Sequence, residues 1–463
     1  MHHNLFYVFM FLIKPISTPE KFLKRLTLFL FFIGFTTSYA QQVATISLKE
    51  AIKIAREHNR NILKSNLEVT LSKENIKENK ELRLPEVELN GMYSRITNLT
   101  EFKGGFLKDK EVTNTIPEIY QVGTAVKMPI YVGNKINNAI KIANQESKIA
   151  LIKKEKSEND IQLEVIGTYL GIYKMMQLQK IIEENIKEEY NRLKEVQSLQ
   201  KHGTVTKNEV IRAELQLSDR ELNALTNSKN IKIALHDFKT LLQVSEEQEI
   251  AIDTTADIDE MNSIDPYDSY MTHALQNEEM RISSQELAVK KTELNLVKGN
   301  YYPSIHFFGN YSLNYPNYKF FPPDPYLYSL GQVGIAASFD LSGLYKNRTK
   351  VEIANTKIQW QVLQSEIVKD KVKDELYRNH TQYQEILERF KVVDKALELA
   401  NENYRIVKLK YFNQLVLVTE MVDADNALLQ AKFNKISTRI DAAMKHYELL
   451  RTAGMLKEEF KIQ

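Results

Sequence analysis

The chain has 463 residues, a charged fraction of 26% and a net charge of +2. This is ample material for a core, but it gives no strongly basic or acidic field, so nucleic acid is not an expected partner. The chain has no cysteine, which excludes disulfides, thiol nucleophiles, thiolate metal sites and anchoring through an acylated cysteine.

Residues 1–40 have the pattern of a signal peptide. Basic Lys21, Lys24 and Arg25 precede the apolar run 26–35, and small residues ending at Ala40 follow it. The apolar run is too short for a permanent spanning helix, and no later stretch approaches the required length. We therefore expect export, with a mature start near Gln41. Such a chain would be periplasmic, secreted, or embedded in a membrane through strands.

The first part of the mature chain, residues 41–243, predicts a helix, a β-hairpin and two long helices. Helical periodicity runs from about Ser47 to Arg83 and stops before Pro85. Strand alternation over 84–131 predicts a hairpin with a polar loop at about 103–114. Helical patterns follow over 134–202 and 205–242, and the first of these would be about 100 Å long.

The remainder of the chain is expected to repeat this order of elements. Residues 244–268 form an acidic linker with nine Asp or Glu and no Lys or Arg. A second unit then occupies 269–463, with a helix, a hairpin over 301–341, and long helices over 346–412 and 416–453. Asn59 precedes Pro85 by 26 residues, and Asn277 precedes Pro303 by the same 26. The two units are therefore expected to be tandem structural repeats.

The long helices carry apolar residues at steps of three, four and seven in both units. This spacing averages near 3.5 residues, which predicts pairing of long antiparallel helices as coiled coils. The antiparallel arrangement follows from the short connections between consecutive helices.

The strands of the second hairpin have two chemically different sides. Odd-numbered positions from Ile305 to Tyr315 are mainly aliphatic or aromatic, whereas His306, Asn310 and Ser312 lie between them. An apolar outer face and a small, polar inner face are typical of a barrel with lipid outside and water inside. For one isolated hairpin, a half-buried position in a soluble domain would be the alternative. Four strands are too few to close a barrel with a lumen, so several chains would have to contribute.

Three features together resemble a known family. They are the tandem repeat with its Asn-to-Pro blocks, the glycines Gly123 and Gly334 after the hairpins, and the break at 203–205 followed by the sequence Glu-Val-Ile-Arg-Ala-Glu-Leu at 209–215. Across essentially all of the mature sequence, the chain resembles the TolC family of outer-membrane efflux and secretion ducts. The resemblance implies an α+β membrane protein. In it, the helices form an α-helical barrel across the periplasm, and the two hairpins give four strands to a twelve-stranded β-barrel of a homotrimer.

The resemblance also implies a location in the cell and partner proteins. The barrel would sit in the lipid of the outer membrane of a Gram-negative cell. A periplasmic adaptor, or membrane fusion protein, would join the trimer to an inner-membrane transporter, as the exit duct of a tripartite efflux or type I secretion system.

The turns between the long helices are the implied docking tips for the adaptor. The tip residues are Gly203, Thr204 and Val205 in the first repeat and Asn413, Gln414 and Leu415 in the second. A tight turn with a small exposed apolar group can dock the hairpin of a partner. Gln414 stands where the family usually has glycine. Turns that only join helices are the alternative.

A second implied site is an acidic aperture at the periplasmic end. Glu420 and Asp423 are spaced i,i+3 and so share a helix face, and trimer symmetry would stack them as two rings that favour cations. Glu209 and Tyr411 match positions whose hydrogen bonds or ion pairs hold such an aperture shut. Val416 stands where the family has a basic partner, so the contacts that hold the aperture shut must differ or be weaker. A solvated helix face is the alternative.

The sequence predicts no catalysis, metal site or cofactor. It contains no HExxH, GxGxxG or P-loop motif, and its histidines fall singly along the chain. The alternative function is a coiled-coil scaffold or adhesin of the periplasm or surface that transports nothing.

Overall fold

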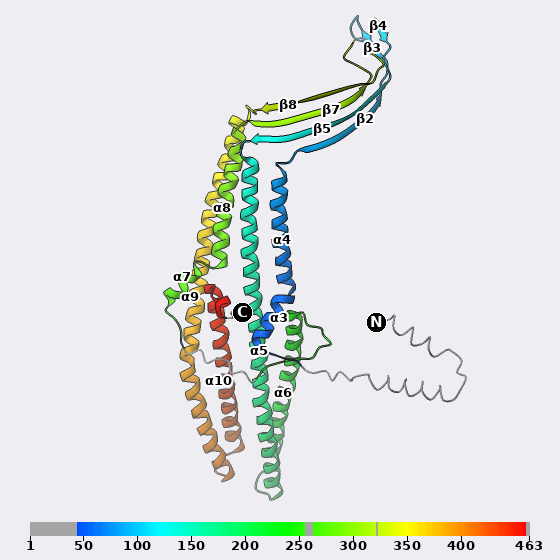
Figure 1. Cartoon of the computed structure of the whole chain (residues 1–463). Coiled ribbons are helices and arrows are strands. Elements are labelled where there is room, and N and C mark those ends of the chain that lie inside the picture. Colours follow the sequence, from blue (N-terminus) through cyan, green and yellow to red (C-terminus); the bar gives the residue numbers. More distant parts are fainter. Residues whose placement is uncertain (1–43, 255–262, 321–322, 460–463) are drawn as a thin grey trace, which may run out of the picture.

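The computed structural model describes residues 44–254, 263–320 and 323–459. The expected signal peptide lies outside these ranges. Long helices run side by side along one axis, and a curved sheet leaves their upper ends at an angle (Figure 1). Among the described residues, no helix combines the length and apolarity needed to cross a membrane.

The first repeat begins with a short strand and two helices in line. Strand β1 (Ala44–Ile46) leads into α3 (Leu48–His58) and α4 (Arg60–Glu81). The single helix expected from about Ser47 to Arg83 is therefore interrupted. Asn59 has extended backbone geometry, its side chain accepts a hydrogen bond from the amide of Asn61, and it donates to the carbonyl oxygen of Leu241. Asn59 thus ends one helix and caps the next.

The second repeat has the same break at Asn277. Helix α7 (Tyr267–Ala274) precedes α8 (Glu278–Lys298), and the side chain of Asn277 accepts from the amide of Met280. A short 3-10 turn, η1 (Gly299–Tyr301), then leads into the second hairpin.

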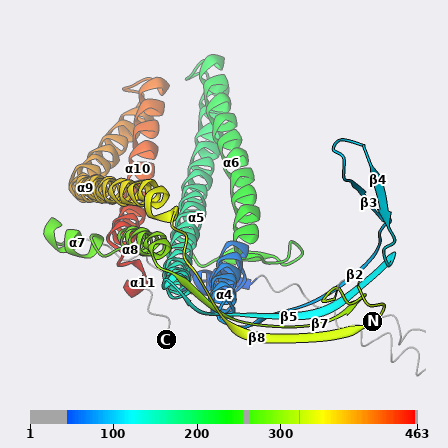
Figure 2. The same cartoon turned by 90° about the horizontal axis from the view of Figure 1, so that it is seen from above.

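The longest helices form two hairpins that reach the lower end of the molecule. Helices α5 (Lys135–Lys201) and α6 (Lys207–Leu242) make the first hairpin, and α9 (Gly343–Phe412) and α10 (Val418–Ala453) make the second. In the upper half the packing order is α4, α5, α8, α9, whereas in the lower half α5 and α10 join the two hairpins. Figure 2 shows the α5–α6 and α9–α10 hairpins from above.

The main core lies at mid-length, where the short elements pack around the long helices. Strand β6 (Ile250–Ile252), within the expected acidic linker, pairs in parallel with β1, and α11 (Leu456–Glu459) follows α10. Large side chains there are fully buried, including Ile166, Phe238, Tyr383 and Leu449. This level holds both repeats together.

The two β-hairpins form one four-stranded antiparallel sheet. Its strands are β2 (Glu86–Arg95), β5 (Glu118–Val132), β7 (Ser304–Tyr315) and β8 (Tyr328–Ser338), in the order β2-β5-β7-β8. The loop expected at 103–114 is partly ordered as strand, because β3 (Leu99–Phe102) pairs with β4 (Lys110–Thr113) beyond the sheet. The β5–β7 register shifts after Pro129, which has no amide hydrogen for the ladder.

Candidate functional site

The register of the sheet aligns side chains of one kind on each face. Tyr93 lies opposite Tyr120, which lies opposite Tyr315, and their rings contact each other in tilted arrangements at centroid distances of 5.3 and 5.4 Å. Because side chains alternate along a strand, this face also collects the following residues: Val87, Leu89, Val122, Val126, Met128, Phe307, Tyr311, Leu313, Val333 and Ile335. The opposite face carries mainly small or polar residues, among them Asn90, Gly123, Ala125, Asn310, Ser312, Gln332 and Gly334.

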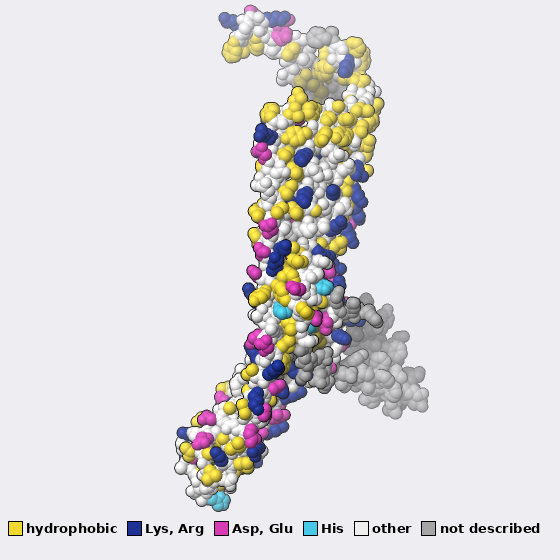
Figure 3. Space-filling view, turned by 90° about the vertical axis from the view of Figure 1, so that its left-hand side faces the viewer, with side chains coloured by type: hydrophobic (Ala, Val, Ile, Leu, Met, Phe, Trp, Pro, Cys, Tyr) yellow, Lys and Arg dark blue, Asp and Glu magenta, His cyan; other side chains and the backbone are white. Residues whose placement is uncertain are grey.

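The apolar face of the sheet has no cover within the described residues. Val87, Leu89, Val333 and Ile335 are exposed by 69%, 75%, 78% and 69%. Hydrophobic side chains also gather where the sheet joins the tops of the helices, while charged side chains of both signs are spread along the helices below (Figure 3). A contiguous apolar surface of this kind indicates contact with another apolar phase or molecule.

Both lateral edges of the molecule are unpaired at two levels. Among the described strands, β2 and β8 each have a neighbour on one side only. Below them, α4 exposes Leu63, Leu67 and Leu71 along one face. On the other edge, α9 exposes a second apolar row, made of Trp360, Leu363 and Ile367. The sheet and the helix layer therefore end on matching sides with surfaces that lack a partner.

The two lower tips have the same backbone despite their different residues. Gly203 has φ +74° and Gln414 has φ +61°, so both lie in the left-handed region. The amide of Thr204 donates to the carbonyl of Leu199, and the amide of Leu415 donates to that of Lys410. Each turn closes its helix with the hydrogen bond of a Schellman motif. The glycine expected at position 414 is thus replaced without loss of the turn.

The other tip residues are mainly accessible. Thr204, Asn413 and Leu415 are exposed, with Leu415 at 73%, and Val205 is half-buried. Leu415 is the largest apolar group presented by the two turns.

The expected aperture residues separate into two environments. Glu420 and Asp423 are exposed near the start of α10, and neither carboxylate has an ion pair or side-chain hydrogen bond to another described residue. Glu209 is half-buried in the first turn of α6. Tyr411 is 8% exposed and packs with Val196, Val418 and Met421 in a small core above the tips, against which the half-buried Val416 also packs.

Tyr411 has no hydrogen-bond partner for its hydroxyl group among the described atoms. Burial raises the pKa of Tyr411, and the nearby charge of Glu209 raises it further. The structure thus brings Glu209 and Tyr411 near each other but does not join them by a hydrogen bond within one chain.

Sequence reasoning missed a buried charged cluster just above the tips. Nη1 of Arg192 on α5 donates to both carboxylate oxygens of Glu189, at 2.9 and 3.1 Å. Nη2 of Arg192 lies 3.5 Å from Oδ1 of Asp425 on α10, and Nη2 of Arg220 on α6 lies 3.8 Å from Oδ2 of Asp425. All four side chains are at most 8% exposed. Asn185 also donates to the carboxylate of Asp425.

The cluster perturbs the ionisation of its members. Burial raises the pKa of Glu189 to about 7, which the charge of Arg192 opposes and the hydrogen bond with Asp425 supports. Burial also raises the pKa of the adjacent Tyr404 to about 12. A sequence signal existed, because Glu189 continues the apolar heptad series of Ile182, Ile186, Leu193 and Val196.

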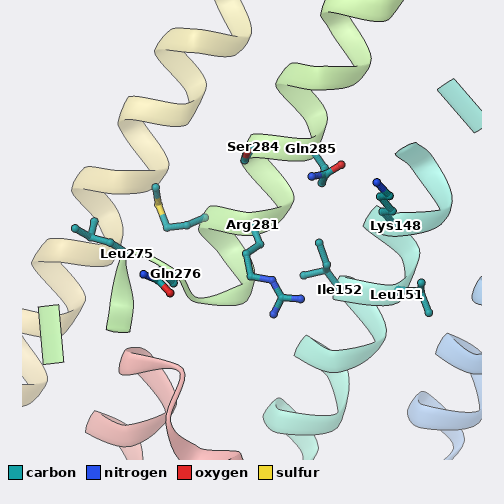
Figure 4. A pocket seen from close by; sticks show the side chains of 9 residues that line it. Lys148, Leu151, Ile152, Leu275, Gln276, Arg281, Ser284 and Gln285 are labelled. Carbon is teal, nitrogen blue, oxygen red and sulfur yellow. The ribbon is translucent and has the colours of Figure 1, made fainter. Parts of the chain in front are cut away.

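A separate groove of about 850 Å³ lies between α5 and α8 (Figure 4). Lys148 and Ile152 face it from α5, and Arg281 faces it from α8. Arg281 is paired with Glu155 at 2.9 Å. None of the residues expected at the tips or the aperture lines this groove.

Comparisons with known proteins show which family and which solved structures the chain resembles. The model of the family described as "outer membrane efflux protein" matches residues 51–242. No curated protein matches the sequence.

Solved structures match over most of the chain at low identity. The CusC channel has a TM-score of 0.74 and 13% identity, with 90% of this chain and 95% of that chain covered. The CmeC outer membrane channel of Campylobacter jejuni has a TM-score of 0.72 and 12% identity, covering 92% and 94%. The open-state MtrE outer membrane channel of Neisseria gonorrhoeae has a TM-score of 0.67 and 14% identity, covering 91% and 94%.

The similarity to solved structures shows a shared fold. The family match adds similarity in sequence within the first repeat. The family consists of transport channels rather than enzymes. Over residues 51–242 the sequence matches the outer membrane efflux protein family, and the fold resembles that of solved TolC-like outer-membrane channels.

Proposed function

We propose that the chain is the outer-membrane exit duct of a tripartite efflux or type I secretion system. It would be a passive channel, with vectorial transport supplied by an inner-membrane pump through a periplasmic adaptor. The observation that carries this proposal is the sheet, which has one exposed apolar face, one mainly small and polar face, and two unpaired edges.

The unpaired edges support closure by copies of the same chain. The edge with β8 and α9 differs from the edge with β2 and α4, so copies would join head to tail and close a ring. The exposed apolar rows on α4 and α9 would cover each other in that arrangement. With four strands from each chain, three copies would give the twelve-stranded barrel implied by the family. Lipid of the outer membrane would then contact the apolar face.

The lower end of the duct would bind the adaptor and select cations. We assign adaptor docking to Gly203, Thr204 and Val205 and to Asn413, Gln414 and Leu415. Exposed Leu415 would supply the apolar contact to a hairpin of the adaptor.

We assign the periplasmic aperture to Glu420 and Asp423, bordered by Glu209 and Tyr411. These two carboxylates, which have no ion pair with another described residue, would form acidic rings that attract cations. In the ring, the unpartnered hydroxyl of Tyr411 would be available to a neighbouring chain.

The test is purification followed by conductance measurement in planar bilayers. We expect a detergent-dependent trimer with a cation-preferring conductance. Recovery as a soluble monomer without detergent would instead support the scaffold or adhesin and overturn the duct.

The acidic aperture has its own test. The double variant Glu420→Gln and Asp423→Asn should reduce the preference for cations. The matched control is Glu385→Gln with Glu388→Gln, because these two exposed glutamates have the same spacing on α9, away from the aperture. Unchanged selectivity of the first variant would remove the aperture assignment.

A further inference from the structure

Four exposed lysines lie along the upper parts of α5 and α8. They are spaced by seven residues on each helix, with Lys141 and Lys148 on α5 and Lys291 and Lys298 on α8. Seven residues are almost two helical turns, so the two lysines of each helix share a face and lie about 10 Å apart along it. None of the four forms an ion pair with another residue in the described ranges.

These lysines lie on the side of the molecule that is convex at the sheet. Lys148 lines the groove between α5 and α8, and so does Ser284, which precedes Lys291 by seven residues. Figure 4 shows this groove with α9, α8 and α5 in the same order from left to right as in Figure 1, so the groove opens toward the viewer of Figure 1. Seen from above, that is the side toward which the sheet bulges (Figure 2).

The four lysines form two rows at different distances from the sheet. Lys298 is the last residue of α8 and Lys141 is the seventh residue of α5, so this upper row lies within about 10 Å of the helix ends that join the sheet. Lys148 and Lys291 form the lower row, about 10 Å farther down.

The charge around the upper row is strongly one-sided. Residues 135–150 and 288–298 together contain six lysines and only two glutamates. One of these glutamates, Glu293, is already paired with Lys290 at 2.9 Å. At the far end of the sheet, by contrast, residues 95–118 contain four basic and four acidic residues. The excess of positive charge therefore lies only where the sheet meets the helices.

The side chains next to the upper row complete an amphipathic gradient. Ile130 and Tyr302, at the strand ends beside the lysines, are exposed by 53% and 57%, and the apolar face of the sheet lies beyond them. A phospholipid leaflet presents its groups in the same order, from acyl chains through the interface to the charged headgroups. Charge complementarity and continuity with the apolar face thus indicate the same occupant.

We propose that Lys141 and Lys298 bind the headgroup phosphates of anionic phospholipids in the leaflet next to the helices. This position in a leaflet rests on the proposed insertion of the sheet into the outer membrane. Anionic headgroups are favoured over zwitterionic ones, because the ammonium group of a zwitterionic lipid repels the lysines and cancels the charge of the phosphate. The lower row lies about a Debye length below the headgroups at physiological salt, so its charges are largely screened from them.

Native mass spectrometry of the detergent-solubilised full chain tests the proposal. The probes are dioleoyl phosphatidylglycerol and dioleoyl phosphatidylcholine, which have the same acyl chains, and the wild type should prefer the first. A basic side chain near an anionic surface strengthens attraction by about 5-fold. The variant Lys141→Gln with Lys298→Gln should therefore lower the preference by about 5-fold to 25-fold. A wild type without preference, or a variant that keeps it in full, would overturn the proposal.

The lower row supplies the matched control. The variant Lys148→Gln with Lys291→Gln loses the same charge from the same two helices and should keep most of the preference. The variant Lys141→Arg with Lys298→Arg should also keep it, since arginine binds phosphate as well. Equal losses in both glutamine variants would refute recognition at the headgroup level. Binding of the wild type to isolated peptidoglycan without any lipid preference would assign the lysines to cell-wall carboxylates and overturn the proposal.

Bilayer conductance separates failure of this lipid site from failure of the duct. A cation-preferring conductance without a preference for phosphatidylglycerol would leave the duct standing and refute the lipid site. A preference that depends on the upper row, in a protein without conductance, would do the reverse.

Discussion

Replacing Gly133 by alanine should destabilise the junction between the sheet and the helices. Gly133 follows β5 with φ +66°, and a Cβ atom added there would lie 2.2 Å from the carbonyl oxygen of Gly299, at the end of α8. A left-handed conformation costs an L-residue about 1–2 kcal/mol, and overpacking adds about 1–3 kcal/mol. We therefore expect a loss of roughly 2–5 kcal/mol for Gly133→Ala.

Two other glycines separate these contributions. Gly203 has φ +74° and open space where a Cβ atom would lie, so Gly203→Ala incurs only the conformational cost of about 1–2 kcal/mol. Gly171 lies inside α5 with no atom within 4 Å of such a Cβ, so Gly171→Ala should stabilise the helix by about 0.5–1 kcal/mol.

The assay is thermal unfolding of the detergent-solubilised protein, followed by far-ultraviolet circular dichroism at a single scan rate. The unfolding midpoint should rank Gly133→Ala lowest, Gly203→Ala next, and Gly171→Ala at or above the wild type. A Gly133→Ala midpoint equal to or above that of Gly203→Ala would refute the close approach of the two repeats at this junction.

Three further predictions concern charge and the membrane. Arg451→Met should cost about 3–5 kcal/mol in the same unfolding assay, because it leaves the carboxylate of Glu278, 3.1 Å away, buried without its cation. Val333→Lys, on the apolar face of the sheet, should cost up to about 2–4 kcal/mol of membrane stability. The matched variant Gln332→Lys, on the opposite face, should stay in urea-washed membranes in the same amount as the wild type. Burial opposes ionisation of Glu279, but two neighbouring lysines outweigh this effect and lower the pKa of Glu279. The ionised Glu279 should therefore stabilise the wild type, and this stabilisation should be lost as the pH falls below about 4.5. The variant Glu279→Gln should lack this pH-dependent contribution.

Local periodicity explains why much of this fold was predictable. The two-residue period of 305–315 already assigned Tyr311 and Asn310 to opposite faces, and the structure keeps that assignment through the register with β5 and β8. The pairing of β5 with β7 was not predictable in the same way, because it joins segments from different repeats and depends on how α5 and α8 pack beneath them.

The breaks at Asn59 and Asn277 had a local signal that periodicity concealed. Apolar spacing continues through both positions, but each asparagine caps the following helix with its side chain. The same limitation applies to Glu189, whose heptad position predicts burial while its charge favours a solvated face. Asp425 lies on a helix of the other repeat, so only the tertiary structure brings both carboxylates to the guanidinium group of Arg192.

The duplicated backbone carries charges that are not duplicated. Positions 211 residues away from Glu189, Arg192 and Arg220 hold Ala400, Asn403 and Ala431, and only Asp425 has a charged counterpart, Glu214, so the cluster as a whole is not repeated in the other half of the chain. In the proposed ring, the joint between α5 and α10 within a chain would therefore contain buried ions. The joint between α6 of one chain and α9 of the next would instead use exposed apolar residues, which include Ile211, Leu215, Leu399 and Leu409.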